Sequence, residues 1–109
     1  MTTGARFLVL WHAPRDPVAF ERHYREVHAP LARRLPGLRR YTFSRNAAAL
    51  RGELPYYLVA ELDWDDMASL RAALRSPEGV ATAADGAKLA AYADYDSMVY
   101  ELDEALEPG

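Results

Sequence analysis

The order of hydrophobic patterns along the chain constrains its fold more than any other feature of the sequence. Strand-like patterns cover residues 6–12, 38–45, 56–63 and 93–102, and helical patterns occupy the segments after the first and third of these. Strand, helix, two strands, helix, strand is the split βαβ order. It predicts an α+β fold with ferredoxin-like βαββαβ topology, in which both helices lie on one face of a four-stranded antiparallel sheet.

The first helical segment has a defined start and a defined buried side. Asp16 supplies a capping carboxylate, and Pro17 occupies the first helical position. Pro30 removes a main-chain hydrogen bond beside His28, so we expect a kink there. Apolar side chains and one histidine recur at helical spacing, and most charged side chains lie off this stripe. The stripe consists of Phe20, Tyr24, Val27, His28, Leu31 and Leu35.

The second helical region is predicted to break in two. Asp65 or Asp66 can cap its first part, and Ser76-Pro77 is a second start signal that opens an alanine-rich part ending near Ala91. Because alanine occurs all around this second part, its periodicity does not indicate which way Asp85 points.

A single copy of this fold would leave one face of its sheet bare. Segments 6–12 and 56–63 carry apolar residues on both sides, so that face would expose a large hydrophobic patch. Packing the sheets of two copies face to face would cover it. We therefore expect a homodimer that forms a dimeric α+β barrel.

Composition narrows the function further. The 109 residues suit a single domain spanning 1–109, and a net charge of −3 without a strong basic patch argues against nucleic-acid binding. No stretch has the length of a membrane span and no signal peptide is evident, so a cytoplasmic protein is expected. The absence of cysteine excludes a cysteine nucleophile, a disulfide and a thiolate metal site.

A set of short motifs, in a fixed order, resembles the EthD family, including its short members labelled EthD family reductases. Any one motif is weak, but their order and spacing cover nearly the whole chain, from about residue 6 to residue 101. The motifs are Asp16-Pro17 with Phe20, Tyr24, His28-Ala29-Pro30-Leu31, Pro36-Gly37-Leu38, the run PYYLVAEL from Pro55 to Leu62, and Ser76-Pro77-Glu78-Gly79 with Asp85.

The resemblance implies a dimeric α+β barrel, usually without a tightly bound cofactor, that works in small-molecule metabolism. Similar proteins include lactone isomerases and the cyclases or dehydratases that tailor polyketides. The chain departs from the family pattern at Trp11-His12, at His23, where a tyrosine is common, and at Leu89, where an aromatic residue is expected. These departures affect the shape of a pocket more than the fold.

The candidate catalytic residues are His28, Tyr24 and Asp85. An inward-facing imidazole with a pKa near its ordinary value can accept and return a proton near neutral pH. Tyr24 can place a substrate oxygen through its phenol, and Asp85, an acidic position of the resembled family, can orient His28. The spacing alone favours a core histidine bonded to the backbone, and Tyr24 as a packing residue.

Six further side chains are candidates for the wall of a substrate pocket. The alternatives for them are core packing, a dimer interface or, for Glu61, an ion pair with an arginine. The six are Trp11, His12, Tyr41, Glu61, Trp64 and Tyr95.

The leading hypothesis is a cofactor-independent isomerase, lyase or cyclase that moves a proton on a small apolar or aromatic metabolite. The three histidines lack the spacing of a metal site, and no GxGxxG motif follows a strand, so neither a metal nor a nicotinamide is expected. Two alternatives remain: a haem enzyme with His28 as axial ligand, and a carrier or sensor that binds a small molecule without catalysis.

Overall fold

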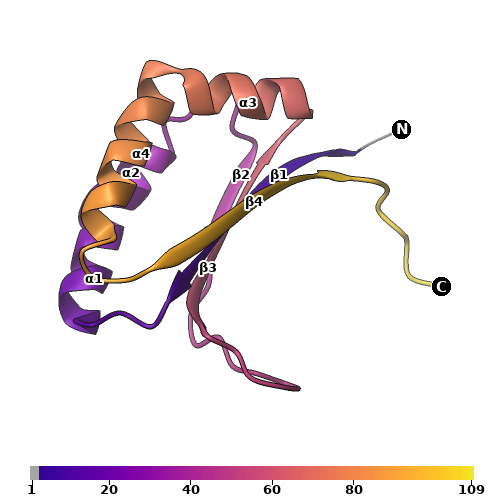
Figure 1. Cartoon of the computed structure of the whole chain (residues 1–109). Coiled ribbons are helices and arrows are strands. Elements are labelled where there is room, and N and C mark those ends of the chain that lie inside the picture. The colour runs from indigo at the N-terminus through magenta and orange to yellow at the C-terminus, as the bar shows by residue number, and fades with distance from the viewer. Residues whose placement is uncertain (1–2) are drawn as a thin grey trace.

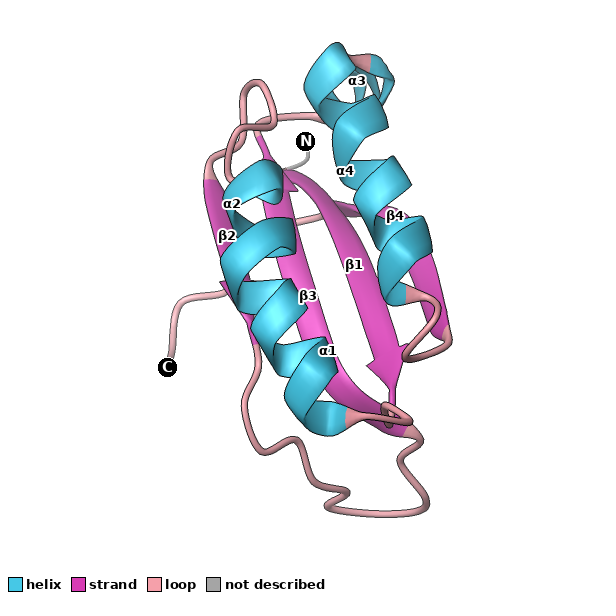
Figure 2. Cartoon of the chain, turned by 90° about the vertical axis from the view of Figure 1, so that its left-hand side faces the viewer, coloured by secondary structure: helices cyan, strands magenta, loops and turns pink. Residues whose placement is uncertain are grey.

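The computed structural model describes residues 3–109. One four-stranded antiparallel sheet has the strand order β2-β3-β1-β4, and the helices cover one of its faces (Figures 1 and 2). This confirms the predicted fold class. The elements are β1 (Gly4–His12), α1 (Pro17–His23), the π-helix η1 (Tyr24–His28), α2 (Ala29–Ala32), β2 (Arg40–Phe43), β3 (Tyr56–Trp64), α3 (Met67–Arg75), α4 (Pro77–Leu89) and β4 (Tyr95–Leu102).

The second strand is shorter than its pattern predicts. β2 keeps only the middle of segment 38–45, although single hydrogen bonds continue on either side, from Arg39 N–H to the Asp63 carbonyl and from Ser44 N–H to the Val59 carbonyl. The other three strands match their predicted segments to within two residues. None of the helices described is long and apolar enough to cross a membrane.

The predicted kink near Pro30 takes the form of a π-helical turn. Asp16 caps α1 by accepting from Ala19 N–H at 3.1 Å, as expected. Because Pro30 has no N–H to give to the carbonyl of Glu26, the ladder shifts, and Ala29 N–H bonds to the Tyr24 carbonyl five residues earlier. The shift also turns Val27 outward. Its predicted place on the buried stripe is wrong, since 41% of it is exposed.

The predicted break in the second helical region is confirmed at Ser76. This residue has extended backbone angles, and its hydroxyl accepts from Gly79 N–H at 3.0 Å at the start of α4. Gly79 allows α4 to turn closely against the end of α3, because a Cβ there would overlap the Ala73 carbonyl oxygen. The turn carries α4 back along the sheet, beside η1 and α2 (Figure 2).

Strand register decides which side chains meet the helices. The cross-strand pairs Phe7–Val99, Val9–Ser97 and Trp11–Tyr95 of β1 and β4 lie on the covered face, as do Tyr41–Leu62 and Phe43–Ala60 of β2 and β3. The alternate pairs lie on the opposite face, which none of the described helices covers (Figure 1). We call it the uncovered sheet face. Its members include Arg6, Leu8, Leu10, His12, Arg40, Thr42, Val59, Glu61, Asp63, Asp96, Met98 and Tyr100.

Candidate functional site

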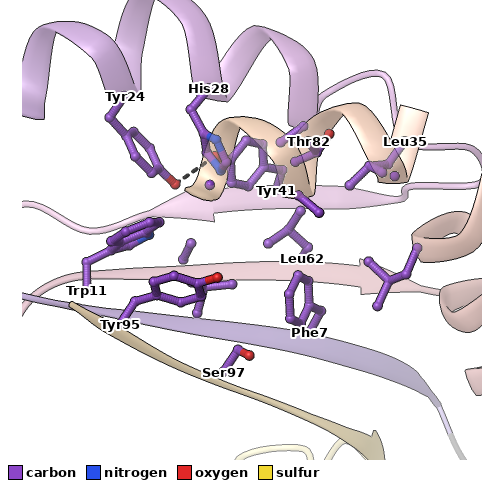
Figure 3. Close-up of a pocket in the computed structure, with 17 residues that line it drawn as sticks. Phe7, Trp11, Tyr24, His28, Leu35, Tyr41, Leu62, Thr82, Tyr95 and Ser97 are labelled. Carbon is purple, nitrogen blue, oxygen red and sulfur yellow. Dashed lines mark hydrogen bonds between the residues drawn. The ribbon is translucent and has the colours of Figure 1, made fainter. Parts of the chain in front are cut away.

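A cavity of about 220 Å³ lies between the covered face of the sheet and the helical layer (Figure 3). Its floor comes from all four strands, and its roof comes from η1, α2, α3 and α4. Most of the lining is apolar, through side chains such as Phe7, Leu35 and Leu62, whereas polar atoms come from a few residues. The lining residues whose side chains carry a polar atom are Trp11, Tyr24, His28, Tyr41, Thr82, Tyr95 and Ser97.

His28 is the titratable group of this lining whose ordinary pKa lies nearest neutrality. His28 is the last residue of the π-helical turn, and its side chain is only 12% exposed. Its Nδ1 lies 2.9 Å from Oδ2 of Asp85. Desolvation by burial lowers the pKa of His28, although the hydrogen bond to Asp85 works in the opposite direction. A neutral imidazole that donates Nδ1–H to Asp85 keeps its lone pair on Nε2, which has no protein partner within residues 3–109.

Asp85 holds two histidines. It is 4% exposed, and while Oδ2 contacts His28, its other oxygen lies 2.8 Å from Nε2 of His23. The packing of α4 against η1 is close here, because a Cβ on Gly86 would lie 3.9 Å from Cε1 of His28. The expected orienting contact of Asp85 is therefore present, and its carboxylate lies behind His28 rather than in the cavity lining.

His23 is a site residue that the sequence patterns do not predict. In a regular α-helix, residues five apart lie about 140° from each other around the axis, so His23 and His28 would face different neighbours. The π-helical turn between them reduces this angle and lets both rings reach one carboxylate. Pro30 was the signal for such a turn, but it does not indicate what the turn brings together. Thr82 and Ser97 of the lining were also missed.

Two phenols face the cavity as a hydrogen-bonded pair. The hydroxyls of Tyr24 and Tyr41 are 2.7 Å apart (Figure 3), and the Tyr24 ring lies 5.3 Å from that of His28. Burial raises the pKa of Tyr41 to about 12 and raises the pKa of Tyr24 as well, so both phenols are neutral near pH 7. One hydroxyl proton joins the two oxygens, which leaves the other proton free for a ligand oxygen.

Trp11 and Tyr95 form the aromatic end of the floor. Trp11 is 1% exposed, its ring is 4.5 Å from Tyr95, and it makes an edge contact with His28 at 6.3 Å. Among the described residues, its buried Nε1–H has no acceptor. An unpaired buried donor costs about 1–3 kcal/mol, so an acceptor beside this ring would be stabilised.

The other three predicted wall residues do not line the cavity. Glu61 lies on the uncovered sheet face, 3.8 Å from Arg6 and 3.6 Å from Arg40. His12 pairs with Asp96 at 3.0 Å on the same face.

Trp64 faces the helical layer but is buried in the core. Its Nε1–H donates to the Pro36 carbonyl at 2.8 Å. Strand alternation explains Glu61 and His12, since they share a face with Leu8 and Leu10 rather than with Phe7 and Trp11.

The cavity does not fit a haem. Its volume is about 220 Å³, which is below the ~300–1,000 Å³ of pockets that hold drug-sized ligands. A haem is larger than most drug-sized ligands and needs a larger pocket still. The geometry therefore gives no support to His28 as a haem ligand.

Comparison with known proteins identifies close relatives. The EthD domain matches residues 12–93. An uncharacterized 11.0 kDa protein from the thcB–thcC intergenic region of Rhodococcus erythropolis is 35% identical over 86 residues, which are 78% of this chain and 82% of that protein. The crystal structure of an EthD family protein from Bacillus halodurans is also 35% identical. It has a TM-score of 0.81 and covers 90% of this chain and 97% of its own.

More distant structures share the fold alone. The cofactor-independent oxygenase SnoaB from Streptomyces nogalater is 20% identical with a TM-score of 0.67, over 97% of this chain and 99% of its own. A dimeric ferredoxin-like protein of unknown function from Thermobifida fusca is 21% identical with a TM-score of 0.68. The match covers 94% of this chain and 93% of that protein. The ferredoxin-like architecture and the extensive family match lead to one conclusion: this chain belongs to the EthD family.

Proposed function

We propose that the protein is a cofactor-independent enzyme that moves a proton on a small, largely apolar carbonyl, lactone or aromatic metabolite. The observation that carries the proposal is the state of His28. A buried imidazole with a lowered pKa borders an apolar cavity and is held through Nδ1 by an almost fully buried carboxylate. This is the arrangement that a general base needs, because it fixes both the tautomer and the direction of the ring.

The proposed step transfers a proton from carbon to nitrogen. Nε2 of His28 takes the proton from a C–H next to a substrate carbonyl, and the bonding electrons move onto the carbonyl oxygen. The hydroxyl of the Tyr24–Tyr41 pair whose proton is free donates a hydrogen bond to that oxygen as negative charge grows on it. Asp85 stabilises the imidazolium until His28 returns the proton. The proton goes either to another carbon, as the electrons return from the oxygen, or to a leaving group, as the same electrons break its bond to carbon.

The size and lining of the cavity define the class of ligand. A volume of about 220 Å³ suits a molecule of one or two rings, with its polar atoms near His28 and Trp11 and its apolar body toward Leu35, Leu62 and Leu74. A protein of the same fold, SnoaB, is described as a cofactor-independent oxygenase, which supports the idea that this architecture can host chemistry without a cofactor.

We also propose that the protein acts as a homodimer joined through the uncovered sheet face. Leu8, Leu10, Val59 and Met98 form its apolar centre, and Met98 is 51% exposed in the single chain. Ion pairs flank this centre at one end, where Arg6 contacts Asp63 at 2.7 Å. Both signs of charge occur there, so a second copy meets no field of like charge. The dimeric protein from Thermobifida fusca has the same fold.

Hydrogen–deuterium exchange at carbon tests the proposed chemistry directly. The probes are mono- and bicyclic ketones, such as 2-tetralone, and γ-lactones, each incubated with the protein in D₂O and followed by proton NMR. We expect wild-type protein to accelerate exchange of the α-hydrogens of those probes that bind. His28→Gln should lose about 10²-fold or more of that acceleration.

His12→Gln is the matched control, because it removes a histidine that is also bonded to a carboxylate but lies on the opposite sheet face. It should leave exchange unchanged. Equal exchange by His28→Gln and wild type would contradict the role of His28. Probes that bind tightly without any accelerated exchange would instead indicate a carrier.

A further inference from the structure

One buried ionic contact is not used by the proposed reaction. His23 does not line the cavity, yet its Nε2 lies 2.8 Å from the carboxylate that holds His28. The two imidazoles differ in their access to water, since the side chain of His23 is 24% exposed and that of His28 is 12% exposed. A single carboxylate thus lies between an inner histidine and an outer one.

We propose that His23, acting through Asp85, keeps His28 in its neutral, proton-accepting form, because the cluster of His23, Asp85 and His28 holds one positive charge and His23 takes it first. His23 is in this view a positioning residue, which sets the charge of the base without touching the substrate. The inference rests on the proposed role of His28 as a base. It adds that His23 sets the pH range in which His28 is neutral and can accept a proton.

The order of protonation follows from charge and burial. With both imidazoles neutral, the cluster carries the charge of Asp85 alone, and a first proton neutralises it. Placing this proton on His23 leaves the new cation in better contact with water, whereas placing it on His28 buries the cation beside an apolar cavity. A second proton would give a buried cluster with a net positive charge, in which two cations share one carboxylate.

The surroundings contain few groups that could change this order. Asp85 is the only ion-pair partner of either imidazole within residues 3–109, and it has no other cationic partner there. Tyr24 and Tyr41, which face His28 from η1 and β2, are neutral because burial raises their pKa. Tyr95 on β4 also lines the cavity that His28 borders. Consistent with the proposal, the charge of His23 is one of the causes that lower the pKa of His28.

A titration of the histidine rings by NMR tests the inference without any substrate. Protein labelled with ¹⁵N in its histidines is followed from about pH 8 to about pH 5, where both imidazole nitrogens report protonation. In the wild type we expect His23 to take up a proton at higher pH than His28. His23→Gln removes the outer cation and should raise the midpoint of His28 by about half a pH unit or more.

Two variants complete the design. His23→Lys keeps a cation beside Asp85, so the midpoint of His28 should stay at or below its wild-type value. His12→Gln changes the third histidine, which is bonded to Asp96 on the uncovered sheet face, and should leave His28 unaffected. An unchanged or lower midpoint of His28 in His23→Gln would overturn the inference, as would uptake of the first proton by His28 in the wild type.

The titration tests the role of His23, and the deuterium-exchange experiment tests the proposed reaction, so the two can be contradicted separately. If His23 protonates first but no probe exchanges, the charge order stands and the proposed reaction is wrong. If probes exchange through His28 while His23→Gln leaves its midpoint in place, the reaction stands and the positioning role of His23 is wrong.

Discussion

Replacing Asp85 with asparagine should reduce His28-dependent exchange of probe α-hydrogens by about 10²–10⁴-fold. The carboxylate offers an acceptor to each imidazole, to Nδ1 of His28 at 2.9 Å and to Nε2 of His23 at 2.8 Å. An amide of the same shape offers one acceptor and one donor. One of the two rings must therefore change tautomer, and the imidazolium of His28 loses its counter-charge in either case.

The control for this variant is Asp96→Asn. Asp96 also holds a histidine, His12, at 3.0 Å, but on the uncovered sheet face. Its replacement should leave exchange near the wild-type rate. Circular dichroism should show the same secondary structure for both variants. An Asp85→Asn protein that is folded and exchanges probes at the wild-type rate would show that Asp85 does not support His28 in catalysis.

The second large effect concerns assembly. Leu8→Asp should weaken the homodimer by about 100-fold or more in its dissociation constant, and the protein should become monomeric at micromolar concentration. Leu8 lies in the middle of a central strand, and on the uncovered sheet face it pairs with Glu61 of β3 and Met98 of β4. In a symmetric dimer each substitution occurs twice, so two carboxylates would be buried without partners at one interface.

Sedimentation equilibrium of wild type and variant measures this effect. Val80→Asp is a suitable control, because Val80 is 62% exposed on α4, in the helical layer on the other side of the sheet. It should remain dimeric. A wild-type protein that sediments as a monomer, or a Leu8→Asp protein that stays dimeric, would contradict an interface built on this face.

The sequence predicts most of the fold because its signals are local. The cap at Asp16, the helix start at Ser76-Pro77 and the periodicity of each segment depend on neighbours within a few residues, and the structure confirms the elements that they predict. β2 is the exception in length. Its outer residues keep only single hydrogen bonds to β3.

The site is harder to predict because it depends on contacts between distant segments. Five residues that the sequence suggests as site candidates line the cavity: His28, Tyr24, Trp11, Tyr41 and Tyr95. The faces of the two central strands could not be assigned in the same way, since both carry apolar residues on each side and alternation alone does not show which side meets the helices.

The contact between Asp85 and two histidines could not be predicted from the sequence patterns. Alanine surrounds Asp85 on α4, so periodicity gives its side chain no direction. His23 and His28 share a partner only because the π-helical turn changes their relative angle, and such a turn is a response to Pro30 within packed surroundings.

The tautomer of His28 at pH 7 is the measurement that tests the central claim most directly. A ¹⁵N spectrum of histidine-labelled wild-type protein distinguishes a protonated ring nitrogen from one that carries a lone pair. We predict a neutral ring with the proton on Nδ1, toward Asp85, and the lone pair on Nε2. A ring protonated on Nε2, or an imidazolium at that pH, would contradict the account of His28 as a base.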